Sequence, residues 1–134
     1  MNQKIRSEIK LKESKKIGDL HKPYLIGEIG TNHNQDINIA KALIKEIAKA
    51  GFDCAKFQTY EANEIVNEII TSKDYKLENL YGNIPAIDMF DKYLKTPKDW
   101  FPELIELCHD LGIDCATTIH GSNGINWIKD LNFD

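Results

Sequence analysis

The sequence lacks the features that would commit it to a membrane, to the cell exterior or to nucleic acid. No apolar run approaches the roughly 20 residues that cross a bilayer, and no apolar core follows the lysine-rich N-terminus as in a signal peptide. The three cysteines form no Cys-x-x-Cys pair, which favours buried thiols in a reducing compartment over disulfides or a zinc site. A net charge of -4 without a basic aromatic stripe argues against nucleic acid. We therefore expect a cytoplasmic protein that binds neither membranes nor nucleic acid.

The length of 134 residues allows one domain with a modest core. Residues 1–22 are polar, and Ile9, Leu11, Ile17 and Gly18 predict a small hairpin that lies as a lid over one end of the molecule. Residues 23–134 are then the domain itself.

Strands and amphipathic helices alternate along that domain. A strand over 24–29 leads through the polar turn 31–35 to a helix capped by Asp36 and ended by Gly51, and a second strand covers 53–59. The long connection 61–95 carries one short helix, at 87–94. A helix within 96–111 starts late, near Asp99, or kinks at Pro102, and a third strand at 114–119 precedes a helix capped by Ser122.

A repeat links these units. Gly51-Phe-Asp-Cys-Ala55 recurs as Gly112-Ile-Asp-Cys-Ala116, each time after a helix, and 131–134 is a weaker third copy. The pattern predicts an α/β fold with three adjacent parallel strands, in either a (β/α)8 barrel or an open doubly wound sheet. A full barrel takes about 200 residues or more. We therefore expect the first three βα units of a TIM-type barrel, with Asp134 just before a fourth strand.

Polar residues cluster near the carboxyl ends of the predicted strands. Because side chains alternate across a strand, Lys56 and Gln58 share one face, and Glu28 lies on the corresponding face of the first strand. The repeat makes Thr117 the equivalent of Lys56. An ammonium, an amide and a hydroxyl together suit a phosphate or a carboxylate, and Glu28 suits acid–base work or the orientation of water. The alternative is a structural ion pair of Glu28 with Lys56.

The histidines do not predict a metal site. His33 lies in the turn after the first strand without a second ligand nearby, which favours a hydrogen-bonding turn residue, and His120 after the third strand is interpreted in the same way.

Two motifs resemble a known family. The first motif is Ile26-Gly-Glu-Ile-Gly-Thr-Asn-His-Asn34, and the second is Ala50-Gly-Phe-Asp-Cys-Ala-Lys-Phe-Gln-Thr59. Together they are similar to the N-terminal part of the sialic acid synthases, which make N-acetylneuraminate, legionaminate and pseudaminate. The resemblance covers about 20–134. It implies a (β/α)8 barrel followed by a C-terminal antifreeze-like domain, so this chain looks like a truncated and, alone, inactive part of a homodimeric enzyme.

The resemblance also implies a reaction. Phosphoenolpyruvate condenses with an N-acetylated amino sugar, such as N-acetylmannosamine or its 6-phosphate, and phosphate leaves. Glu28, Lys56 and Gln58 are the implied catalytic residues, and Lys56, Thr117, Asn32 and His33 the implied substrate-binding residues. A divalent Mn2+ or Mg2+ polarises the sugar aldehyde, with ligands beyond residue 134.

One departure and two alternatives accompany this interpretation. The family usually carries Ser-Thr-Pro-Phe at the end of the third strand, where this chain has Ala116-Thr-Thr-Ile-His120, so a divergent sugar substrate is an open alternative. The other functions considered are a Schiff-base aldolase that uses Lys56 as nucleophile, and a non-catalytic barrel fragment.

Overall fold

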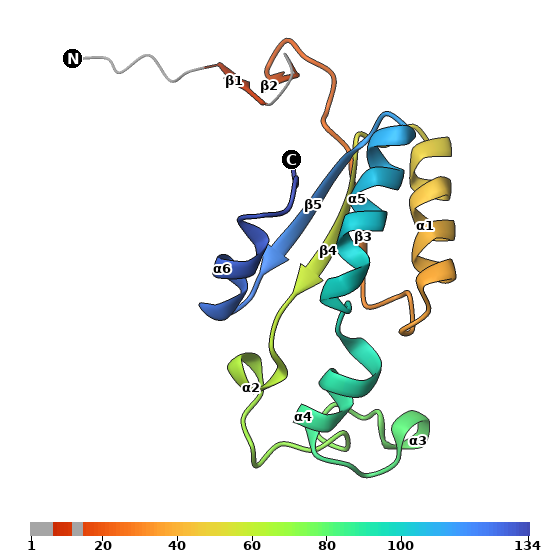
Figure 1. Cartoon of the computed structure of the whole chain (residues 1–134), viewed down its shortest axis with the longest axis vertical. Coiled ribbons are helices and arrows are strands. Elements are labelled where there is room, and N and C mark those ends of the chain that lie inside the picture. Colours follow the sequence, from red (N-terminus) through yellow and green to blue (C-terminus); the bar gives the residue numbers. More distant parts are fainter. Residues whose placement is uncertain (1–6, 12–14) are drawn as a thin grey trace, which may run out of the picture.

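A computed structural model of the chain describes residues 7–11 and 15–134. Strands β1 (Glu8–Lys10) and β2 (Lys16–Gly18) pair antiparallel, with Ile9 opposite Ile17. The predicted hairpin is therefore confirmed for the described residues, while 1–6 and 12–14 of that segment lie outside them. Figure 1 shows the hairpin beyond the end of the sheet at which β5 begins.

Three strands form the central parallel sheet: β3 (Ile26–Gly30), β4 (Cys54–Thr59) and β5 (Asp114–Ile119). They are adjacent in the order β3-β4-β5 and all pairings are parallel, as the sequence predicted. Glu28 is opposite Lys56, but Gly30 is opposite Phe57, so β3 contains an irregularity at Ile29. All three carboxyl ends therefore meet at one edge of the sheet.

Helices α1 (Ile37–Lys49) and α5 (Phe101–Asp110) pack on one face of this sheet. The Asp36 carboxylate caps α1 by accepting the Asn38 N–H at 2.7 Å. Pro102 lies in the first turn of α5, where its missing N–H leaves no helical bond unmade, so the predicted late start is confirmed. A short 3-10 turn, η3 (Lys98–Trp100), precedes it. The buried residues between sheet and helices form the core: Ile29, Ala40, Ile44, Ala55, Phe57, Phe101, Leu104, Ile105, Cys108, Ile113 and Cys115.

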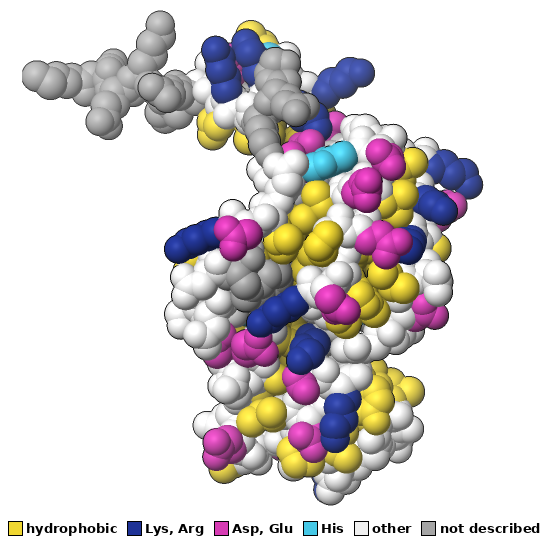
Figure 2. All heavy atoms as spheres, viewed as in Figure 1, with side chains coloured by type: hydrophobic (Ala, Val, Ile, Leu, Met, Phe, Trp, Pro, Cys, Tyr) yellow, Lys and Arg dark blue, Asp and Glu magenta, His cyan; other side chains and the backbone are white. Residues whose placement is uncertain are grey.

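The long connection between β4 and α5 forms a lobe beyond the carboxyl ends of the strands (Figure 1). It holds α2 (Ala62–Ile65), α3 (Glu78–Tyr81), α4 (Ala86–Met89) and the π-helix η2 (Phe90–Leu94). The short helix predicted at 87–94 is thus found as α4 continued by η2. Hydrophobic side chains appear among the charged ones on the face of this lobe seen in Figure 2, and several large ones in this connection are exposed: Ile65, Ile69, Tyr75, Leu80 and Tyr93.

The last helix, α6 (Asn123–Ile128), returns the chain to the start of β5. The Asp134 N–H donates to the carbonyl of Cys115 at 2.9 Å, and the Phe133 ring meets Phe101 edge-on at 5.2 Å. Ser122 holds the N-cap position, but its side chain makes no capping bond, so the prediction that Ser122 caps this helix is wrong. No helix among the described residues combines the length and the apolar character needed to cross a bilayer.

Candidate active site

Glu28 and Lys56 form an ion pair on the sheet face opposite α1 and α5. Lys56 Nζ lies 2.7 Å from Glu28 Oε2, and the side chains are 32% and 45% exposed. The pairing follows from the register, which sets these two residues opposite each other on neighbouring strands. An ion pair this exposed contributes only about 0–1 kcal/mol to stability. Stability alone therefore gives little reason to place both charges here.

Gln58 and Thr118 continue the same face toward the carboxyl end. Gln58 is opposite Thr118 in the β4–β5 register and two residues beyond Lys56, so its amide lies past the ion pair. Gly30, with φ of +54°, lies beside both residues, because a Cβ there would lie 3.7 Å from both Gln58 Nε2 and Glu28 Oε1. A carboxylate, an ammonium and an amide thus lie together on this face of the sheet.

Thr117 does not belong to this group, so the predicted convergence of Thr117 with Lys56 is wrong. Thr117 is opposite Phe57, and its Oγ1 lies 2.8 Å from Thr59 Oγ1 on the side that faces the helices. The residue opposite Lys56 is Ala116. The repeat aligned Cys54 with Cys115, one residue away from the hydrogen-bonded register, and a shift of one residue moves a side chain to the other face.

Thr118 is the residue that the sequence analysis missed. The sequence contains a pattern that indicates this placement. Ile113 and Cys115 are apolar and face the helices, and alternation along the strand puts Thr117 on that same face. Alternation then leaves Ala116 and Thr118 for the face of Lys56.

His33 is a structural residue of the turn after β3. Its side chain is completely buried, and the ring lies edge-on to Trp100 at 5.5 Å. Nδ1 accepts the Gln35 N–H at 3.1 Å, which leaves the proton on Nε2 to be donated to Thr96 Oγ1 at 3.0 Å. Burial lowers the pKa of His33, so the ring stays neutral. The hydrogen-bonding role is confirmed, both ring nitrogens having partners within the protein, and the substrate contact of His33 stays a prediction.

The turn held by His33 has an uncommon backbone conformation. Asn34 and Gln35 both have positive φ, of 48° and 57°, which is unfavourable for residues other than glycine. Gln35 Nε2 donates to the carbonyl of Lys95 at 2.7 Å, a second bond between this turn and the segment before α5. The turn thereby presents Asn32, which is exposed, at the carboxyl end of β3.

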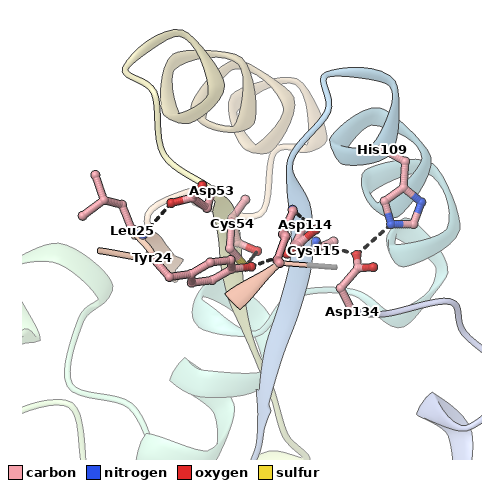
Figure 3. A network of polar contacts seen from close by, with 10 residues as sticks. Tyr24, Leu25, Asp53, Cys54, His109, Asp114, Cys115 and Asp134 are labelled. Carbon is pink, nitrogen blue, oxygen red and sulfur yellow. Dashed lines mark hydrogen bonds and ion pairs between the residues drawn. The ribbon is translucent and has the colours of Figure 1, made fainter. Parts of the chain in front are cut away.

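A separate polar network closes the opposite, amino end of the sheet (Figure 3). The Tyr24 hydroxyl donates to Asp114, and Lys15 Nζ lies 2.5 Å from the same carboxylate. Burial, followed by the bond to Asp114, raises the pKa of Tyr24, and burial raises the pKa of the Cys54 thiol to about 11. Asp134 accepts the Cys115 N–H at 3.0 Å. The raised pKa values keep Tyr24 and Cys54 protonated, and Asp114 and Asp134 both accept hydrogen bonds, so these groups are suited to holding the strands together.

The site residues do not include a metal-binding set. Across residues 7–11 and 15–134, no group of three or more His, Cys, Asp or Glu side chains is arranged to hold a metal ion. The cysteines Cys54, Cys108 and Cys115 are buried free thiols, as predicted. The divalent cation, with ligands beyond residue 134, stays a prediction.

The chain is similar in sequence to known proteins. The model of the NeuB family matches residues 43–134. N,N'-diacetyllegionaminic acid synthase of Legionella pneumophila is 31% identical over 108 residues, which cover 81% of this chain and 30% of that protein. Pseudaminic acid synthase of Helicobacter pylori is 30% identical over 119 residues, which cover 84% and 33% respectively.

A solved structure has a similar fold. The N-acetylneuraminic acid synthetase of Leptospira borgpetersenii, crystallised with citrate, superposes with a TM-score of 0.75 at 27% identity and covers 94% of this chain and 39% of that one. The chain thus spans about a third of the length of the relatives that it matches.

Proposed function

Because this chain belongs to the NeuB family, we propose that the protein containing it is a nonulosonic acid synthase. It condenses phosphoenolpyruvate with an N-acetylated amino sugar, such as N-acetylmannosamine or its 6-phosphate, and releases phosphate. In this proposal β3, β4 and β5 are the first three strands of a (β/α)8 barrel, and the full-length protein is a cytoplasmic homodimer. The observation that carries the proposal is the cluster of Glu28, Lys56 and Gln58 on one face of parallel strands, which extends toward the carboxyl ends, where barrel enzymes place their active sites.

Lys56 binds phosphoenolpyruvate in this scheme. Its ammonium is the cation of this cluster, and charge-assisted hydrogen bonds to carboxylate or phosphate oxygens are among the strongest available. The Glu28 carboxylate repels an anion, so the sugar, whose reacting aldehyde end is neutral, occupies the Glu28 side. Thr118, beside Gln58, adds a hydroxyl donor on the third strand.

Glu28 and Gln58 serve the second substrate and water. The enol carbon C3 of phosphoenolpyruvate forms a bond to the sugar aldehyde carbon, whose oxygen takes up a proton from solvent, and C2 becomes electron-deficient. Water adds to C2 while Glu28 accepts one of its two protons. The bond between C2 and the phosphate oxygen then breaks, the remaining hydroxyl proton leaves with the phosphate group, and a ketone remains. Gln58 orients the water or a sugar hydroxyl with its amide.

Lys56 is poorly placed for the Schiff-base alternative. Lysine nucleophiles are activated by desolvation or by a neighbouring cation. Lys56 instead lies beside a carboxylate and is about one-third exposed.

The test uses the full-length protein with phosphoenolpyruvate, a divalent cation and a panel of N-acetylated amino sugars. The proposal predicts phosphate release that requires one of the sugars and produces a nine-carbon acid in equal amount. Phosphate release without sugar, or none with any sugar, contradicts it. Borohydride treatment with mass spectrometry checks the aldolase alternative, which requires a covalent adduct on Lys56.

A further inference from the structure

The carboxylate of Glu64 contacts the turn that follows β5. Glu64 lies on α2, in the long connection, and its Oε1 accepts the backbone N–H groups of Ser122 at 3.1 Å and Asn123 at 3.3 Å. The Ser122 hydroxyl donates to the same oxygen at 3.3 Å. These donors begin α6, so Glu64 supplies from another element the cap that the Ser122 side chain does not.

Gly121 is shaped to receive this carboxylate. Its φ of +87° favours glycine, and a Cβ added there would overlap Glu64 Oε2. Glu64 Oε2 is buried and has no hydrogen-bond partner among the residues that the structure describes. Burying a carboxylate oxygen in this way is costly unless the other oxygen is well bonded, as Oε1 is. We call Glu64, Gly121, Ser122 and Asn123 the clasp.

The clasp lies next to the candidate active site. Thr118, opposite Gln58, is three residues before Gly121. The intervening His120 is bound to the end of β4, because its N–H donates to the Thr59 carbonyl at 2.8 Å and its ring lies 6.3 Å from that of Tyr60. The carboxyl end of β5 and the turn after it are therefore held by both β4 and Glu64.

We propose that Glu64 is a positioning residue that fixes the β5–α6 turn, and with it Thr118, at the carboxyl end of the sheet. This role rests on the proposed function for its effect on catalysis, but the clasp itself is independent of it. Glu64 does not touch the reacting atoms; it acts through the backbone of residues 121–123.

Amide hydrogen exchange on the full-length protein tests the clasp directly. Glu64→Ala should speed exchange at Ser122 and Asn123 by about ten- to a hundredfold, the scale of a hydrogen bond to a charged group, and speed it less at Thr118. Glu64→Gln, which keeps an acceptor oxygen, should restore part of the protection. Glu68→Ala, which removes an exposed carboxylate from the same connection, is the matched control and should change neither. Unchanged exchange at Ser122 and Asn123 in Glu64→Ala overturns the clasp.

Two further measurements separate positioning from mere stability. Gly121→Ala should lower the denaturation midpoint less in a Glu64→Ala background than in the wild type, because the overlapping carboxylate is gone. Glu64→Ala should also lower kcat/KM about tenfold. The value for Glu64→Gln should lie between those of the wild type and Glu64→Ala, and Glu68→Ala should match the wild type. Faster exchange with unchanged kinetics overturns the positioning role. A wild type without synthase activity refutes the proposed function, and exchange at Thr118 then decides the positioning claim alone.

Discussion

Replacing Lys56 with alanine in the full-length protein should weaken phosphoenolpyruvate binding and leave folding nearly intact. Lys56 is 32% exposed, and the Glu28 carboxylate left behind is 45% exposed and can be solvated. Loss of the ion pair should therefore cost no more than about 1 kcal/mol of stability. The charge-assisted hydrogen bonds that the ammonium makes to the substrate are worth about 1.5–3 kcal/mol, so the dissociation constant should rise about ten- to a hundredfold.

Calorimetric titration of phosphoenolpyruvate and, separately, of the sugar measures this effect. The sugar affinity should change little, because Lys56 contacts only the anionic substrate in the proposed scheme. Lys49→Ala is the matched control, since Lys49 is an exposed lysine with a carboxylate neighbour, Glu46, at the last turn of α1. An unchanged affinity for phosphoenolpyruvate in Lys56→Ala, or an equal loss in Lys49→Ala, would refute the binding role and leave the structural ion pair.

Three other predictions concern the scaffold and the isolated chain. Burial lowers the pKa of His33, so its contribution to stability is present above the pKa of the unfolded state and is lost as pH falls through the pKa of the folded state. Urea titrations should show the free energy of unfolding falling below about pH 6.5, by at most about 1.4 kcal/mol per pH unit for this group. The slope should be smaller in His33→Gln. Gly27→Ala should destabilise the fold by about 1–3 kcal/mol, because the new Cβ would lie 2.7 Å from the Ile47 side chain. The same substitution should cost less in an Ile47→Ala background, where that side chain is smaller. Residues 1–134 alone should release no phosphate from phosphoenolpyruvate with sugar and Mn2+, since a barrel site collects groups from many strands; turnover by the soluble monomer would show that the site has been misplaced.

The sequence predicted the elements whose signals are local. Asp36, the apolar face of α1 and Gly51 define that helix without reference to the rest of the chain, and Pro102 fixes the start of α5 by its own geometry. The pairing of Glu28 with Lys56 followed from strand alternation, because both residues lie in the middle of clear strands.

The errors involve contacts between distant segments. Thr117 was misplaced because a repeat in sequence does not fix the hydrogen-bond register between β4 and β5. Ser122 looked like a cap by residue type, whereas the capping oxygen comes from Glu64, 58 residues earlier in the chain. For His33, the motif did not show that Thr96, a residue of the distant segment before α5, contacts its Nε2 atom.

A crystal structure of the full-length protein with phosphoenolpyruvate tests the central claim most directly. The account predicts that a carboxylate or phosphate oxygen of the ligand lies within about 3 Å of Lys56 Nζ, at the carboxyl ends of β3 and β4 and beside Gln58. Phosphoenolpyruvate bound elsewhere, for example at the amino end beside Lys15, with the Glu28–Lys56 pair unaltered and remote from the ligand, would contradict it.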